Sequence, residues 1–147
     1  MSAHTFRVLP ALLLGHRMRR GLAQKAMAVA CGLDQSTYCA IERGRRGVLR
    51  MDVVERLGAA LSLEAEERAQ LLWAVEHDRL LAELMRGPAG SAALLVSAAM
   101  NASRRLTADE QSGVVRYITE LVEAREKLER AAAGGRALER AEESSMT

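Results

Sequence analysis

Three glycines divide the first 45 residues into short segments of similar length, and this spacing limits what the chain can fold into. Gly21, Gly32 and Gly44 each follow a segment of helical periodicity, and glycine is the usual residue just past a helix C-terminus. Aromatic and β-branched residues are sparse, whereas Ala, Leu, Glu and Arg, which favour helices, are abundant. The chain is therefore predicted to be all-α.

Apolar residues recur at helical spacing through the N-terminal part of the chain and predict five helices there. Pro10 suits the first turn of the first helix because its missing N–H has no helical partner to lose, and Asp34 is a good N-cap for the third. The expected ranges are about 10–20, 23–31, 35–43, 51–61 and 64–84. Proline and glycine then disfavour helix continuation, so we expect a linker at 87–90 that closes an N-terminal domain of residues 1–86.

Beyond the linker, residues 91–134 are predicted to form a helical region of two helices. The first is alanine-rich and ends near Ser103. The second begins at Thr107, which is followed three residues later by a glutamate in the pattern of a capping box. We expect Gly134–Gly135 to end this helix and the last residues, 135–147, to form a disordered tail.

The second of these helices carries a repeated apolar stripe. Its members recur every three or four residues and are interrupted once, by Arg125; they are Val114, Ile118, Leu121 and Leu128. A period of 3.5 residues is typical of a coiled-coil seam and predicts a dimer interface. Packing on the preceding helix explains the stripe equally well, and a symmetric bundle of two such helix hairpins would satisfy both interpretations.

The two parts of the chain differ in charge. Residues 1–50 carry nine basic and two acidic side chains, whereas the remainder carries 12 basic and 17 acidic ones. This asymmetry favours a polyanion-binding module joined to a region with another role. An arginine-rich solvated face would give the same imbalance, so charge alone does not decide between the two.

Several function classes find no support in the sequence. No apolar stretch approaches the roughly 20 residues of a membrane span, and no signal peptide is apparent, so we expect a cytoplasmic protein without a membrane partner. Two cysteines, Cys31 and Cys39, are too few for a disulfide framework or the usual zinc site. The histidines are scattered and no phosphate-binding loop is present, so we expect no enzyme activity, metal or cofactor.

The most specific pattern lies in residues 24–43. Ala28 is small where two short helices would approach closely, and Gly32 tolerates the positive φ that a tight turn needs. The inner faces would be filled by apolar side chains, namely Met27, Cys31, Leu33, Tyr38 and Ile41. These features together are those of a helix-turn-helix.

The stretches Leu22–Lys25, Gly32–Tyr38 and Ile41–Arg46, with the Arg17-x-x-x-Gly21-Leu22 lead-in, resemble the Cro/C1-type helix-turn-helix. This family contains phage repressors and the bacterial xenobiotic-response-element regulators. The resemblance covers residues 9–75 and implies a five-helix, lambda-repressor-like domain that binds double-stranded DNA. It also implies a transcriptional regulator, such as a repressor, that acts as a homodimer at the nucleoid.

The resemblance assigns roles to individual residues. Base edges in the major groove would be read by Gln35, Ser36, Cys39 and Ala40. The DNA phosphates would be contacted by Gln24, Lys25, Thr37, Arg43, Arg45 and Arg46. Arg17 would pair with Glu42 and so lock the orientation of the third helix. Cys39 and Ala40 are short, which implies little direct readout from the middle of that helix.

Two further interpretations accompany these roles. Cys31 is expected in the core, and His16, at a position that is usually aliphatic in the family, is expected to be a partly buried packing residue whose polar atoms are satisfied. The alternative function is an antitoxin or protein-interaction adaptor, which would bind a partner protein through its C-terminal helices and for which DNA binding would be secondary.

Overall fold

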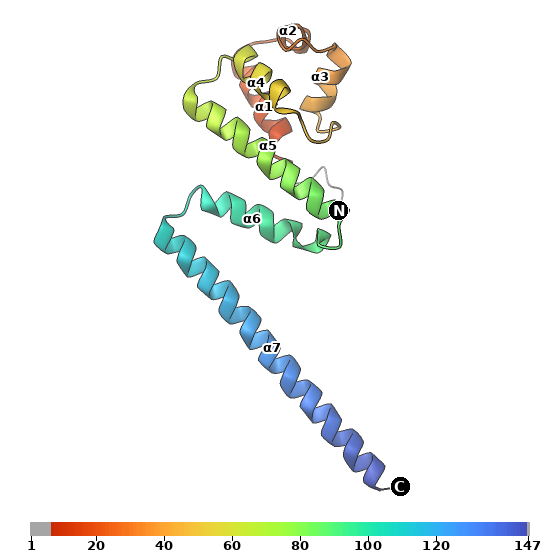
Figure 1. Ribbon diagram of the computed structural model, residues 1–147. Coiled ribbons are helices and arrows are strands. Elements are labelled where there is room, and N and C mark those ends of the chain that lie inside the picture. Colours follow the sequence, from red (N-terminus) through yellow and green to blue (C-terminus); the bar gives the residue numbers. More distant parts are fainter. Residues whose placement is uncertain (1–6, 147) are drawn as a thin grey trace. The chain divides into compact units, whose positions relative to one another are not determined.

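The computed structural model describes residues 7–146, and all regular secondary structure within them is helical (Figure 1). The order of elements is α1 (Leu9–Arg19), α2 (Gln24–Ala30), α3 (Gln35–Glu42), α4 (Met51–Ala60), α5 (Ala65–Arg86), the 3₁₀ helix η2 (Gly90–Ala92), α6 (Ala93–Ser103) and α7 (Ala108–Ser145). The all-α prediction and the five N-terminal helices are confirmed. The chain forms two compact units, and the boundary between them lies between Met100 and Asn101. Each unit is described separately below.

The three glycines that delimit the first helices adopt the left-handed backbone conformation. Gly21, Gly32 and Gly44 have φ of 63°, 62° and 69°, a region that residues with a Cβ rarely occupy. Each allows the chain to turn directly after α1, α2 or α3. The glycine spacing in the sequence therefore predicted the helix ends for the correct physical reason.

One apolar core holds the first five helices together. α1 packs against α3 and α5, α2 packs against α3 and α4, and α4 also packs against α5. The side chains at its centre are almost fully buried, and the largest are Leu13, Met27, Tyr38, Leu57, Leu61 and Leu71. Burial of each such side chain contributes about 1.5–3 kcal/mol. Cys31 is also fully buried, as expected.

The N-terminal unit extends beyond the predicted linker. α5 does end at Arg86, but α6 contacts the unit through Ala93, which is 2% exposed, and through a 2.9 Å contact from Ser97 Oγ to Nε2 of His77 on α5. The domain boundary expected at 87–90 therefore lies after Met100 instead. A proline–glycine turn interrupts the helical hydrogen bonds without separating the side chains on either side of it.

The C-terminal unit consists mainly of α7. This helix begins with the predicted capping box, in which Thr107 Oγ1 accepts from the Glu110 N–H and Glu110 accepts from the Thr107 N–H. It continues through Gly134 and Gly135 to Ser145, so the predicted helix end and the disordered tail from residue 135 are wrong. An exposed glycine weakens a helix by about 1 kcal/mol but keeps its N–H, and the flanking Ala, Arg and Glu residues favour the helix.

Two findings concern the described residues as a whole. None of the helices in residues 7–146 combines the length and apolar character that crossing a bilayer requires. The same residues contain no cluster of three or more histidine, cysteine or acidic side chains that could hold a metal ion.

Candidate nucleic-acid interface

Helix α3 presents one face to the core and another to solvent. Tyr38, Ile41 and Glu42 point inward and are buried. Of the four side chains expected to read bases, Gln35 and Ser36 are exposed, whereas Cys39 and Ala40 are half-buried. Cys39 and Ala40 therefore offer little exposed surface for contact with base edges. The exposed residues of this region are Gln35 and Ser36 in the first turn of α3 and Arg43 just after its end.

Asp34 organises the first turn of α3. Its carboxylate accepts the Thr37 backbone N–H at 2.8 Å and the Thr37 hydroxyl at 2.6 Å, and it also accepts the Ser36 hydroxyl. These hydrogen bonds, led by that from Ser36, hold the pKa of Asp34 far below its usual range. The Ser36 and Thr37 protons are therefore directed at Asp34. Because a phosphate oxygen can only accept, Thr37 must release this bond before it can donate to a phosphate.

Glu42 joins three helices at the base of α3. Its two carboxylate oxygens accept from the Arg17 guanidinium at 2.7 and 2.8 Å, so the predicted ion pair forms. Gln24 Nε2 donates to the same carboxylate at 3.2 Å. Burial alone would raise the pKa of Glu42, but the hydrogen bonds from its neighbours, that of Arg17 first, outweigh this effect and lower it.

Gln24 is the first residue of α2, where backbone N–H groups can meet a phosphate. Its contact with Glu42 is an additional role, which the sequence analysis did not assign, and it leaves the side-chain carbonyl as an acceptor. Lys25, the next residue, is exposed. Buried Tyr38 lies close to the same carboxylate, and burial together with Glu42 raises the pKa of its phenol.

A basic loop follows α3 and carries the other predicted phosphate contacts. Arg43, Arg45 and Arg46 are all exposed. The loop leaves the helix through Gly44, and the N–H groups of Arg45 and Arg46 donate to the Ala40 carbonyl at 2.8 and 3.3 Å. The three arginines therefore stand beside the outward face of α3 on a short, hydrogen-bonded turn.

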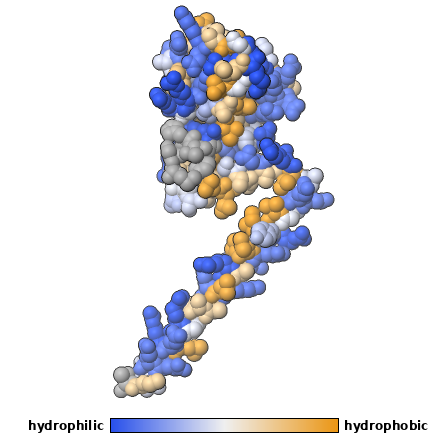
Figure 2. Space-filling view, turned by 180° about the vertical axis from the view of Figure 1, so that it is seen from behind, coloured by the Kyte–Doolittle hydropathy of each residue, from blue (hydrophilic) through white to orange (hydrophobic). Residues whose placement is uncertain are grey.

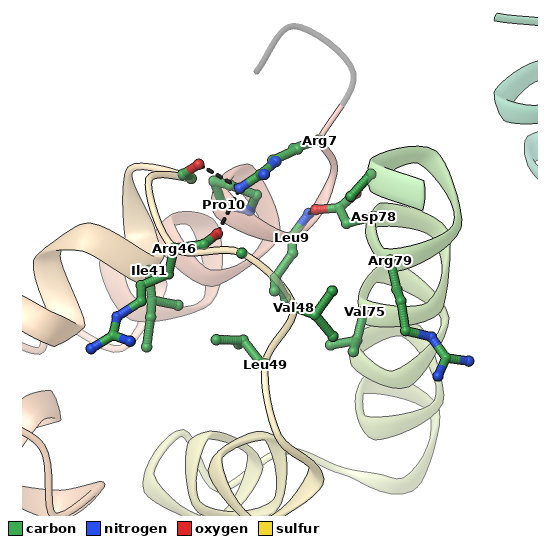
Figure 3. A pocket seen from close by; sticks show the side chains of 13 residues that line it. Arg7, Leu9, Pro10, Ile41, Arg46, Val48, Leu49, Val75, Asp78 and Arg79 are labelled. Atoms are coloured by element: carbon green, nitrogen blue, oxygen red, sulfur yellow. Dashed lines mark hydrogen bonds between the residues drawn. The ribbon is translucent and has the colours of Figure 1, made fainter. Parts of the chain in front are cut away.

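Arg7, which the sequence analysis did not single out, contacts this loop from the other side. Its NH1 group donates to the carbonyls of Gly44 and Arg46, the latter at 2.6 Å (Figure 3). A small pocket lies next to this contact, between the loop, the start of α1 and α5. No periodic or motif signal marks Arg7, because its role depends on a contact 37 residues away along the chain.

Asp78 on α5 was missed as well. Its carboxylate accepts the backbone N–H groups of Val8 at 2.8 Å and Leu9 at 3.0 Å, and so caps α1 from another helix. His77 links Asp78 to Ser97, with contacts of 3.0 and 2.9 Å from its two ring nitrogens. We interpret this series as structural, because His77 is 0% exposed and no substrate can reach the imidazole.

His16 is more deeply buried than expected. It is 1% exposed, and its Nδ1 lies 3.0 Å from Arg19 NH2 and 3.1 Å from Arg20 NH1. Its Nε2 is buried and has no hydrogen-bond partner among the described residues, so the expectation of a fully satisfied histidine is wrong. Burial and the nearby Arg19 lower its pKa, with Glu67 acting in the opposite direction.

The apolar stripe of α7 lies at the surface. Val114, Ile118, Leu121 and Leu128 are between 42% and 67% exposed, and Val115, Tyr117 and Val122 beside them are exposed too. Figure 2 shows orange, apolar side chains along much of this helix. Arg125 pairs within the helix, where its Nε lies 2.9 Å from Glu129. We name the first four residues the α7 stripe.

Comparison with known proteins agrees with this description of the N-terminal unit. Residues 11–71 match a family model described as a helix-turn-helix domain. The matched region includes α2 and α3, the turn at Gly32 and the basic loop. No curated protein and no solved structure matches the chain. Residues 11–71 therefore form a helix-turn-helix domain, which suggests DNA binding.

Proposed function

We propose that this helix-turn-helix chain is a sequence-specific, double-stranded DNA-binding transcriptional regulator of the Cro/C1 type that acts as a homodimer. α3 is the recognition helix and enters the major groove with Gln35 foremost. Gln35 can donate to and accept from one adenine at the same time, which makes it the main base-reading residue. Arg43, Arg45 and Arg46 neutralise phosphates beside the groove.

One observation carries the proposal. Gln35 and Ser36 are exposed on the first turn of α3, and three exposed arginines follow directly after this helix within the helix-turn-helix domain. This arrangement combines a group that can distinguish bases with charges that bind any sequence. Ser36, with its proton held by Asp34, presents an acceptor on the same turn and favours bases that offer an amino group.

The homodimer is supported by the exposed α7 stripe. A single small helix-turn-helix contacts too little DNA for tight specific binding, and pairing two half-sites raises the affinity through effective concentration. Four large apolar side chains at a 3.5-residue period fit a second copy of the same helix. The helices of two copies would then cover the stripe and present two recognition helices to DNA.

The second candidate function uses the same stripe differently. An antitoxin or adaptor would cover α7 with a partner protein of another sequence, and DNA binding would be secondary. The half-buried positions of Cys39 and Ala40 favour this candidate, because they leave the recognition face with few long side chains. The two candidates differ in whether the purified chain alone is dimeric and selects particular DNA sequences.

The decisive experiment is capture of fragmented genomic DNA from the source organism by the purified full-length chain, followed by sequencing. Enrichment of a few sites with an inverted repeat supports a dimeric regulator. Gel shifts on an enriched site and on a shuffled duplex then measure the specificity. Absence of any complex at low salt, where phosphate contacts are strongest, contradicts the proposal.

A further inference from the structure

We propose that Arg7 is a positioning residue for the basic loop, which it holds in the conformation that meets the DNA phosphates; this inference rests on the proposed DNA binding. The NH1 group of Arg7 donates to the carbonyls of Gly44 and Arg46. These two carbonyls bracket Arg45, so one guanidinium group fixes the backbone on both sides of it. Arg7 itself lies outside residues 11–71, which match the helix-turn-helix family model.

The part of the loop that carries the arginines has few backbone hydrogen bonds of its own. Arg45 and Arg46 share the Ala40 carbonyl as their backbone acceptor, and from Gly47 to Arg50 the chain has no regular secondary structure. The exposed arginine side chains repel one another. A loop that is ordered before binding loses less conformational entropy when it meets DNA.

Arg7 is itself held in place by a second contact. Asp78 binds the N–H groups of Val8 and Leu9, and its side chain is only 12% exposed. The segment that carries Arg7 is thereby fixed to α5, as Figure 3 shows for Arg7, Leu9 and Asp78. Asp78 therefore acts on the loop through Arg7 without being part of the DNA-facing surface.

The packing around Gly44 shows how closely the loop is seated. A Cβ at this position would lie 3.1 Å from Cγ of Pro10 and 3.6 Å from Cδ of Arg7. The left-handed φ of Gly44 directs its carbonyl to Arg7. Both hydrogens of NH1 are used by the two loop carbonyls, so this part of the guanidinium is already engaged with the protein.

The test uses full-length variants and a random-sequence duplex as the probe. Arg7→Ala is expected to weaken binding roughly tenfold, which corresponds to about 1.4 kcal/mol. In a background that lacks the Arg45 and Arg46 side chains (Arg45→Ala with Arg46→Ala), the same change is expected to have a much smaller effect, since there is less left to position. Arg79→Ala is the matched control. Arg79 is an exposed arginine that lines the same pocket, but it pairs with Glu76 and not with the loop.

Amide hydrogen exchange without DNA provides the independent readout. Arg7→Ala is expected to speed exchange of the Arg45 and Arg46 amides while those in α5 stay at wild-type rates. Asp78→Asn, which keeps the Arg7 charge, is expected to shift both exchange and affinity in the same direction as Arg7→Ala but less strongly.

Three outcomes would overturn the inference. If Arg7→Ala leaves amide hydrogen exchange of Arg45 and Arg46 unchanged, Arg7 does not anchor the loop. This result can be obtained without DNA, so it is distinguishable from failure of the proposed DNA binding. A loss of affinity that persists in full when both Arg45 and Arg46 are replaced by alanine means that Arg7 contacts DNA directly. An equal loss in Arg79→Ala means that the effect is one of net charge.

Discussion

Arg17 and Glu42 form an ion pair with two hydrogen bonds that fastens α1 to the end of α3. The Nε–Oε2 and NH2–Oε1 distances are 2.8 and 2.7 Å. The side chains are only 12% and 4% exposed. Two parallel bonds between planar groups fix an angle as well as a distance, so this pair sets the orientation in which α3 is presented.

Loss of one partner should be costly for stability. Glu42→Gln keeps the shape but leaves the Arg17 charge nearly buried without a counter-ion, and we expect the free energy of unfolding to fall by about 3 kcal/mol. Glu129→Gln is the matched control, since it breaks the exposed pair with Arg125 and should change stability by no more than about 0.5 kcal/mol. Urea denaturation of both variants measures the difference, and similar small losses would contradict the prediction.

His16 should make stability depend on pH. Its pKa in the folded chain lies below the ordinary value of 6.5 because of burial and the neighbouring arginines. The unfolded chain therefore binds a proton more readily, so this contribution to stability is complete above pH 6.5 and is lost as the pH falls toward the folded-state pKa.

His16→Leu should flatten this part of the pH profile. Leucine cannot bind a proton, and it also removes the buried Nε2 that has no partner among the described residues. Denaturation curves at a series of pH values below 6.5 test the prediction. Wild-type and variant profiles that stay parallel there would show that His16 does not cause the slope.

The proposed roles of Gln35 and Arg46 predict different losses. Gln35→Ala should relax the base preference at one position of the site and cost about 1–3 kcal/mol there, with little change on random DNA. Arg46→Ala should weaken binding to all sequences alike and reduce the slope of log K against log salt by about one per protomer. Affinities for specific and random duplexes across a salt series separate the two patterns. If Gln35→Ala weakens both duplexes equally, it does not read a base.

The α7 stripe should carry the proposed dimer. Leu121→Glu places a charge in the middle of the stripe at a residue that is already 58% exposed, so the single chain should remain folded while the dimer dissociates. Thr119→Glu adds the same charge at an exposed position outside the stripe. Sedimentation should report a monomer for the first variant and a dimer for the second. A dimer that persists in Leu121→Glu would exclude the stripe as the interface.

Most helix boundaries of the N-terminal unit could be predicted because they depend on residues close together in the sequence. Gly21, Gly32 and Gly44 mark helix ends through their own backbone freedom, and Asp34 and Thr107 cap helices through atoms within three residues. The Arg17–Glu42 pair came from the resemblance to a known helix-turn-helix, which supplied a long-range contact that no spacing rule contains. α7 is the counterexample: Gly134 and Gly135 predicted a helix end, but the neighbouring residues support a continuous helix.

The sequence by itself determined which segments are helical, where the first helices turn and which face of α3 carries polar groups, since hydrogen bonds and side-chain periods act over a few residues. Only the tertiary structure decided that Arg7 donates hydrogen bonds to the loop after α3 and that Asp78 caps α1. It also decided that most of α6 belongs to the N-terminal unit. These contacts join residues far apart in the chain. Their formation depends on how the core places whole helices in space, and no local pattern records that placement.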